Sequence, residues 1–265
     1  MSIKFSIITV CLNAGKALKK TVDSVLGQEY ENIEMIIKDG GSSDGSLNLI
    51  NKNEKINVIV ARDKSLYDAM NQAIEYATGE FLLFLNAGDV FYNQTVLKDV
   101  SGCLEGELAD VVYGDYCRGN VIVKQPNCMT SFSLFRNPLN HQSMFFLKES
   151  FLYEKWYRTE FRILADYELT VRSFVSGKRF LHIPVVIDDY EGAGVSESKK
   201  GLQLSRKEMK FIRKRYFEKE YIKYSVMIGI TFPRLRGLMV SDRMPRIITS
   251  NYRKVTNFLN EHINK

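Results

Sequence analysis

The first 117 residues alternate buried-strand patterns with helical patterns, and this alternation limits the possible folds more than any other feature. A continuous apolar run with Thr and Val predicts a buried strand over residues 5–11, and further strands are predicted over 33–38, 56–61 and 81–85. Apolar residues recur at helical spacing over 18–26 and 65–77. Strands that alternate with helices of this length form parallel βαβ units with right-handed crossovers. We therefore expect an α/β fold.

The loops that follow these strands are the expected place for a binding site. In sheets of this kind, ligands bind beyond the carboxyl ends of the strands. Four loops should accordingly meet around one crevice, at residues 9–13, 39–44, 62–64 and 86–89.

The pattern changes after residue 110. Residues 111–117 and 121–125 alternate as two strands of a hairpin, 143–147 is a further short strand, and 166–176 is an amphipathic helix. From residue 199 the strand signal fades, and a basic helix over 201–219 precedes an apolar stretch over 221–232. We predict a mixed central sheet in a domain of residues 1–198, with halves 1–110 and 111–198, and a basic helical C-terminal extension over 199–265.

The net charge of +6 conceals an uneven distribution. Residues 199–265 hold 17 Lys and Arg against 5 Asp and Glu, a charge of about +12. Residues 1–198 hold the other 20 basic and 26 acidic residues, a charge of about −6. A basic extension on an acidic body predicts an anionic partner, either membrane headgroups or nucleic acid. The extension has no recognised groove-reading or zinc motif, so we expect no nucleic acid.

Composition excludes several other classes of protein. The four cysteines are scattered without CxxC spacing, which argues against a zinc site or a disulfide framework and fits a reducing compartment. The N-terminus shows a strand pattern in place of a secretion signal. No apolar run in the sequence reaches the roughly 18–20 residues that are needed to span a bilayer.

Three acidic positions are candidates for chemistry. Asp39 closes a buried strand before two glycines, where it either recognises a ligand or forms a turn. Asp89 ends a short loop with Asn86 after another buried strand, which suits Mg²⁺ or Mn²⁺ but also an ordinary turn. Asp166 begins a helix, as a general base or as an N-cap.

Two further features have a functional and a structural interpretation. His141 either binds a metal or phosphate or serves a structural role. Residues 191–196, with two glycines, form either a mobile lid or a surface loop.

Taken together, the segments resemble the family 2 glycosyltransferases, which have the GT-A fold, over roughly residues 3–196. The matching stretches are Phe5–Asn13, Lys38–Gly45, Asp68–Asn71, Gly79–Asp89, Asn140–Ser143 and Ala165–Leu169. The fold expected is a GT-A Rossmann-like fold with a mixed central sheet. The subgroup that the motifs at 68–71 and 85–89 resemble assembles colanic acid, O-antigen and capsule.

The resemblance implies roles for single residues. Donor-binding residues would be Thr9 at the nucleobase, Asp39 at the uracil edge, and Asn86 at the ribose or a metal-bound water. Asn13, Arg62 and Lys64 lie in loops that approach the donor. Asp89, with His141 as a further candidate, would hold the divalent metal, Mn²⁺ or Mg²⁺. Asp166 matches the catalytic base.

The implied activity is that of an inverting, hexosyltransferase-type enzyme. It would move a sugar from a nucleotide-sugar, with UDP favoured, to a hydroxyl of a lipid-linked oligosaccharide in surface polysaccharide biosynthesis. The extension would rest on an anionic membrane, which makes the protein cytoplasmic and peripheral at the inner face of the plasma membrane. The other readings of the extension are a helical cap on the core and an oligomer contact.

This sequence departs from the family pattern at two places. Gly40 stands where the family often has a second acid, and residues 86–89 hold a single acid. The donor diphosphate would therefore supply much of the metal coordination. Because this loop holds only one acidic residue, an alternative is a degenerate non-catalytic subunit that binds carbohydrate or nucleotide. A nucleotide-transferring relative is disfavoured because residues 11–16 lack a glycine-rich basic phosphate loop.

Overall fold

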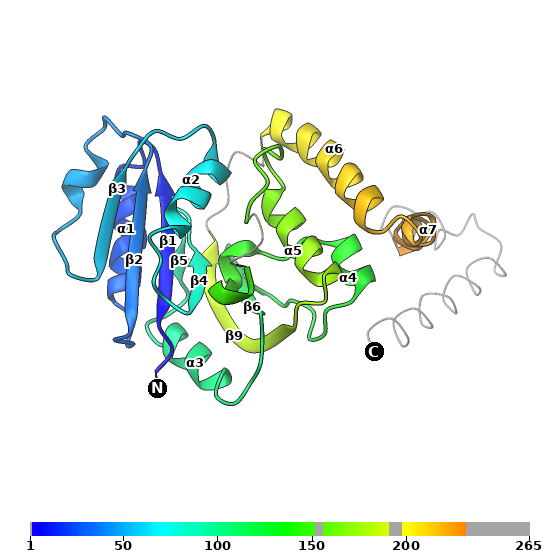
Figure 1. Ribbon diagram of the computed structural model, residues 1–265, viewed down its shortest axis with the longest axis horizontal. Coiled ribbons are helices and arrows are strands. Elements are labelled where there is room, and N and C mark those ends of the chain that lie inside the picture. Colours follow the sequence, from blue (N-terminus) through cyan, green and yellow to red (C-terminus); the bar gives the residue numbers. More distant parts are fainter. Residues whose placement is uncertain (1, 152–155, 191–197, 232–265) are drawn as a thin grey trace. The chain divides into compact units, whose positions relative to one another are not determined.

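The computed structural model describes residues 2–151, 156–190 and 198–231 (Figure 1). The strands are β1 (Phe5–Cys11), β2 (Ile33–Asp39), β3 (Ile56–Val60), β4 (Phe81–Phe84), β5 (Val90–Phe91), β6 (Val111–Arg118), β7 (Val121–Val123), β8 (Met144–Leu147) and β9 (Phe180–Tyr190). The α-helices are α1 (Lys16–Leu26), α2 (Leu66–Ile74), α3 (Val96–Cys103), α4 (Ser131–Arg136), α5 (Ala165–Val175), α6 (Lys199–Tyr216) and α7 (Tyr221–Thr231). Short 3-10 helices are η1 (Ser46–Leu49), η2 (His141–Ser143) and η3 (Lys148–Phe151).

The described strands form one mixed sheet. Eight of them follow the order β3-β2-β1-β4-β8-β6-β9-β5, and β7 pairs with β6. The first four are parallel, as the alternating pattern predicts. β8 is antiparallel to both β4 and β6, while β9 is parallel to β6. The prediction of a mixed central sheet is therefore confirmed.

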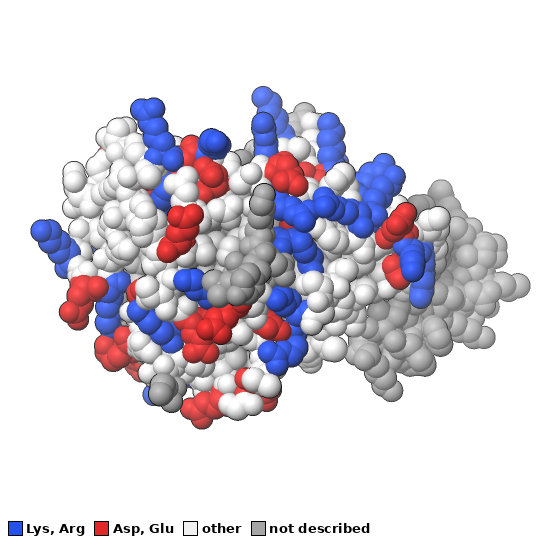
Figure 2. Space-filling view, in the orientation of Figure 1, with Lys and Arg blue, Asp and Glu red and all other residues white. Residues whose placement is uncertain are grey.

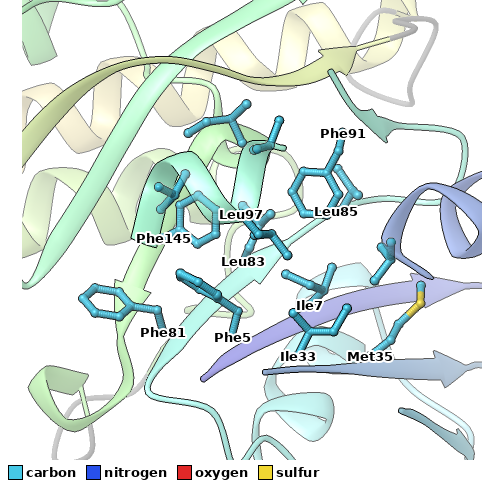
Figure 3. Packing of buried hydrophobic residues seen from close by; sticks show 14 of the residues in the cluster. Phe5, Ile7, Ile33, Met35, Phe81, Leu83, Leu85, Phe91, Leu97 and Phe145 are labelled. Carbon is cyan, nitrogen blue, oxygen red and sulfur yellow. The ribbon is translucent and has the colours of Figure 1, made fainter. Parts of the chain in front are cut away.

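Alternate residues of the parallel strands face two helical layers. Phe5, Ile7, Met35 and Leu83 point to one face and belong to the main buried cluster with residues of α1 and α3 (Figure 3). α2 lies along β1 and β2 and buries its own apolar side on the sheet. Because both faces are covered, β1, β2 and β4 are rich in apolar residues. The candidate site residues Asp39 and Asp89 lie at or just beyond the carboxyl ends of these strands.

The sequence pattern does not predict β5, α3, α4 or β9. β9 is the longest strand, and it pairs with β6 through a register shift near Gly114. A Cβ atom at Gly114 would lie 2.4 Å from the carbonyl oxygen of Val185, so only glycine admits this approach. β9 then ends beside β5, which brings Asp188 and Asp189 next to Phe91 and Val90.

The chain comprises two compact units, residues 1–127 with 139–209 and residues 128–138 with those from 210 on. In the second unit, Phe135 of α4 packs its ring edge-to-face on Phe217, Tyr221 and Tyr224, with centroids 5.3–5.8 Å apart. The Arg213 guanidinium lies 4.7 Å from the Phe135 ring centre. The predicted boundaries at residues 110 and 198 stay predictions.

The helices predicted for the C-terminal extension are present as α6 and α7. Within the described ranges, we find no helix with both the length and the apolarity to cross a membrane. The predicted lid at residues 191–196 and the basic residues beyond 231 lie outside the described residues.

Candidate active site

A buried threonine on α1 fixes the turn after β4. The Thr21 hydroxyl donates to the carbonyl oxygen of Asp89 at 2.8 Å and accepts the Gly88 N–H at 2.9 Å. Gly88 has φ of 109°, which side-chain-bearing residues rarely adopt. Thr9, fully buried on β1, donates to the Leu85 carbonyl oxygen at 2.7 Å. The Asp89 side chain is thereby held at the carboxyl end of the sheet, 6% exposed.

The Asp39 carboxylate organises its own loop. It accepts the N–H groups of Gly41 and Ser42, each at 2.7 Å, and the Ser42 hydroxyl at 2.5 Å. Burial acts to raise the pKa of Asp39, but these hydrogen bonds outweigh it and the pKa lies below its ordinary value. Burial, followed by the neighbouring Asp39, raises the pKa of the Cys11 thiol to about 12. The structure therefore shows the turn-forming role of Asp39, and its role toward a nucleobase stays a prediction.

The loops after β1 and β2 are joined by hydrogen bonds. Asn13, exposed and with φ of 54°, accepts the Ser43 N–H at 2.9 Å through its side chain. Its own N–H donates to the Ser42 hydroxyl at 2.8 Å. The loop after β3 joins them through the buried Lys38, which pairs with Asp63 at 3.1 Å. Three of the four predicted loops thus lie together.

Arg62 and Lys64 lie in the loop after β3, and both are exposed. The Lys64 N–H donates to the Asp68 carboxylate at 2.8 Å, which ties the loop to α2. No hydrogen bond or ion pair in the described part of the structure joins either side chain to the other predicted site residues, so their approach to a donor stays a prediction.

His141 and Asp166 form the central contact of the site. The His141 Nδ1 lies 3.0 Å from the Asp166 Oδ2, and each side chain is about a fifth exposed. The His141 Nε2 lies 3.2 Å from the Asn86 amide nitrogen. Both ring nitrogens thus face protein groups, and a metal at His141 would have to replace the Asn86 contact. The pair brings a residue of α5 to the turn after β4.

A tyrosine on α2 donates a further hydrogen bond to Asp166. The Tyr67 hydroxyl lies 3.1 Å from the Asp166 Oδ1 and donates to the Ile163 carbonyl oxygen at 2.6 Å. Burial acts to raise the pKa of Asp166, but His141, the Tyr167 N–H and Tyr67 outweigh it, so the pKa is lowered. Burial likewise acts to lower the pKa of His141, and Asp166 raises it above the ordinary value. Asp166 is therefore an ionised carboxylate at neutral pH.

A second acidic cluster surrounds Asp89. Gln142 donates to the Asp89 Oδ2 at 2.9 Å, and the Asn140 amide lies 3.1–3.2 Å from both Asp188 oxygens. Burial, and then the negative charge of Asp89, raise the pKa of Asp188 to about 8. Both of these donors are uncharged amides, and the charge of His141 acts to lower the pKa of Asp188.

The sequence analysis missed Thr21, Tyr67, Gln142 and Asp188. Gln142 stands within a matched motif, and Asp188 belongs to an acid pair that ends an apolar stretch, a usable signal. Thr21 and Tyr67 look like ordinary helix residues. A surface hollow of about 510 Å³ beside η1 and β3 is lined by residues 47–58 and holds none of the predicted site residues.

The sequence has known relatives. Residues 6–156 match the family model described as Glycosyl transferase family 2. A PGL/p-HBAD biosynthesis glycosyltransferase of Mycobacterium bovis is 32% identical over 209 residues, which cover 73% of this chain and 79% of that protein. An uncharacterized glycosyltransferase of Mycobacterium tuberculosis is 30% identical over 181 residues, which cover 63% of this chain and 68% of that protein.

Solved structures share the fold at low sequence identity. S. aureus TarS 1–349 in complex with UDP gives a TM-score of 0.64 at 17% identity, over 91% of this chain and 76% of that one. The Pyrobaculum calidifontis mannosyltransferase PcManGT, in complex with GDP-Man and Mn²⁺, gives 0.60 at 14% identity, over 100% and 86%. The fold is therefore GT-A and Rossmann-like. Since the family model spans more than half of the chain, and the mycobacterial relative aligns along most of its own length, this chain belongs to glycosyl transferase family 2.

Proposed function

We propose that the chain transfers a hexose, with inversion, from a nucleotide-sugar to a hydroxyl of a lipid-linked oligosaccharide in surface polysaccharide biosynthesis of the colanic-acid, O-antigen or capsule type. The observation that carries this is the ionised Asp166, held by His141 and Tyr67 beside the turn after β4. TarS is known with UDP and with UDP-GlcNAc, and PcManGT with GDP-Man, which supports a nucleotide-sugar donor. We favour UDP from the family resemblance.

Asp166 is the proposed general base. The acceptor hydroxyl gives its proton to the Asp166 carboxylate while its oxygen bonds to C1 of the sugar. The C1–O bond to the diphosphate breaks on the opposite face, and its electron pair leaves with the diphosphate. One base and one in-line displacement invert C1. The lowered pKa of Asp166 keeps the base ionised throughout the neutral range.

The residues around Asp89 fit a divalent cation that takes some of its ligands from the protein and the others from the donor. Among the described residues, no three His, Cys, Asp or Glu side chains converge to hold a metal alone. Burial first, and then the negative charge of Asp89, raise the pKa of Asp188, so the carboxyl groups of Asp89 and Asp188 interact electrostatically. Asp89 would hold Mn²⁺ or Mg²⁺ together with the diphosphate, where a bound cation stabilises the charge of the leaving group.

The metal proposal is tested by calorimetry. We expect Mn²⁺ to bind measurably only when the nucleotide is present, and Asp89→Asn to abolish this cooperative binding. Asp99→Asn, at an exposed position on α3, is the matched control. Tight retention of Mn²⁺ after dialysis without nucleotide would refute shared coordination.

We also propose that α6 rests on an anionic membrane, which would place the enzyme at the cytoplasmic face of the plasma membrane. Its exposed residues form a basic face flanked by two apolar side chains, and Figure 2 shows Lys and Arg gathered over this helix. The face consists of Leu202, Arg206, Lys207, Lys210, Phe211 and Lys214. Such a face binds anionic lipid through both charge and apolar contact. A helical cap and an oligomer contact are the rival interpretations.

Flotation with anionic liposomes decides between them. Replacement of Lys207, Lys210 and Lys214 with Gln should release the protein from the liposomes. Replacement of three exposed lysines elsewhere, Lys16, Lys52 and Lys98, should not. Equal flotation of both triple variants would refute the membrane face, and a changed oligomeric state in the first would favour the oligomer contact.

The second candidate function is a non-catalytic subunit that binds nucleotide or carbohydrate, and the single acid of residues 86–89 favours it. A donor screen by nucleotide release, with Mn²⁺ or Mg²⁺ and a panel of nucleotide-sugars, separates the two. Release that depends on wild-type Asp166 supports the transferase. Donor binding without release for every donor, with acceptor lipid present, would support the subunit.

A further inference from the structure

The basic helix α6 reaches the segment before α5 through its one acidic residue. Glu208 is 8% exposed, and its carboxylate accepts three consecutive backbone N–H groups. Oε1 accepts the Arg162 N–H at 2.9 Å, and Oε2 accepts those of Ile163 at 3.1 Å and Leu164 at 2.9 Å. This is an extensive set of charge-assisted hydrogen bonds on one side chain.

These bonds supply what the start of α5 lacks. α5 begins at Ala165, and the preceding Leu164 has no side chain that can cap the helix. Helix N-termini leave backbone N–H groups unsatisfied and favour a negative charge nearby. Glu208 supplies the negative charge from another helix, and it accepts the N–H of the N-cap residue Leu164 together with those of the two residues before it. The position of the first turn of α5 therefore depends on α6.

Asp166 is the second residue of that turn. Tyr67 holds the same segment as well, because its hydroxyl contacts both the Ile163 carbonyl oxygen and the Asp166 carboxylate. A shift of residues 162–164 would accordingly move Asp166 away from His141, 3.0 Å distant. Catalytic geometry tolerates little displacement, since about 1 Å can cost on the order of 10²-fold in rate.

We infer that Glu208 is a positioning residue that sets the catalytic base, so that α6 is part of the catalytic machinery as well as a surface helix. The inference rests on the proposed role of Asp166. A truncation at residue 199 would then remove a catalytic support together with the basic face, which is why the membrane test above uses substitutions.

Turnover of three variants gives the first test. Glu208→Ala should lower kcat about 10- to 100-fold and leave the donor KM within about twofold, because the donor loops are untouched. Glu208→Gln keeps one oxygen for Ile163 and Leu164 and should lose less. Glu218→Ala removes the same charge from an exposed position and should behave as wild type.

The NMR signals of the His141 ring nitrogens report on the contact with Asp166 independently of turnover. The chain has three histidines, and His182 contacts Asp115 at 3.3 Å in a separate pair, which serves as an internal reference. In nitrogen NMR of histidine-labelled protein, Glu208→Ala and Glu208→Gln should shift the His141 signals and leave those of His182 unchanged. The folded reference signals also show that a variant has retained its structure.

The outcomes are separable. Unchanged His141 signals in both Glu208 variants, or a kcat equal to that of Glu218→Ala, would overturn the inference. Normal turnover in Asp166→Asn would instead refute the base assignment, and the His141 signals would still show whether Glu208 holds the start of α5.

Discussion

Asp166, whose side chain is about a fifth exposed, and the buried Asp188 are two acids of one site whose pKa values shift in opposite directions. Burial acts to raise the pKa of both. Asp166 faces the raised-pKa imidazole of His141 and the hydroxyl of Tyr67, and its pKa is lowered. Asp188 faces the amide of Asn140 and the charge of Asp89, and its pKa rises to about 8. At Asp166 the hydrogen-bonding partners outweigh burial, whereas at Asp188 burial and the charge of Asp89 act in the same direction.

This difference assigns the two regions different tasks. On the Asp166 side, the protein itself stabilises a carboxylate that can accept a proton. On the other side, the negative charge of Asp89 helps to raise the pKa of Asp188, and a bound cation would lower the pKa of both carboxyl groups. Substitutions that remove one group at a time, near Asp166 or near Asp188, test this difference.

The largest effect is expected from Asp166→Asn. Loss of the general base should lower kcat by about 10²- to 10⁴-fold, while the dissociation constant of the donor stays nearly unchanged. Glu160→Gln, at an exposed position before α5, should keep wild-type turnover. Single-turnover nucleotide transfer and calorimetric donor titration measure the two quantities. Near-normal turnover would remove Asp166 from its proposed role.

The stability of the metal-free protein tests the other region. The pKa of Asp188 is about 8 in the folded protein and ~4 in an unfolded chain, so folding takes up a proton between these values. The free energy of unfolding should therefore fall as the pH rises through this window, by an amount on the order of a few kcal/mol. Asp188→Asn should abolish this dependence. Denaturant melts from pH 5 to 9 measure it.

The same melts sharpen the comparison. Asp166→Asn should lower the free energy of unfolding at pH 7, because His141 and Tyr67 lose a charged partner. Asp188→Asn should leave it unchanged or higher at pH 8 to 9. If both substitutions destabilise equally at high pH, the two acids do not differ as argued.

The parallel half of the fold could be predicted because its signals are local. β1, β2 and β4 are rich in apolar residues, Asp39 is the last residue of β2, and Asp89 closes the short turn after β4. β9 gives only a short signal, the apolar stretch before Asp188, because Pro184 interrupts the strand and its partner β6 lies far away in sequence. Strands of this kind are defined by pairing more than by composition.

The support of the site could not be predicted for the same reason. Tyr67 lies 99 residues before Asp166, and Glu208 lies 44 residues after Leu164. Each looks locally like an ordinary helix residue. Only the folded chain shows that Tyr67 faces a carboxylate and that Glu208 accepts backbone N–H groups. The positions proposed to react lie in short sequence motifs, whereas the residues that hold them are brought close only by the fold.

His141 permits a pair of matched substitutions. His141→Asn keeps a donor near the position of Nδ1, toward Asp166, whereas His141→Gln keeps one near Nε2, toward Asn86. If the Asp166 contact is the important one, His141→Gln should lose about tenfold in kcat, the value of one charge-assisted hydrogen bond, and His141→Asn should lose less. Weaker nucleotide-dependent Mn²⁺ binding in both variants would instead favour the metal-ligand role.

The smallest effect is expected from Tyr67→Phe. The substitution removes the hydroxyl that contacts Asp166 and Ile163 but keeps the ring, which packs 5.3 Å from that of Tyr157. One hydrogen bond of about 1 kcal/mol corresponds to roughly fivefold in kcat. The neighbouring Tyr157 provides the control, because its buried hydroxyl has no hydrogen-bond partner in the described structure. Tyr157→Phe should therefore keep full turnover and equal or greater stability. A loss of turnover equal in the two variants would mean that ring packing, and not the Tyr67 hydroxyl, sets Asp166.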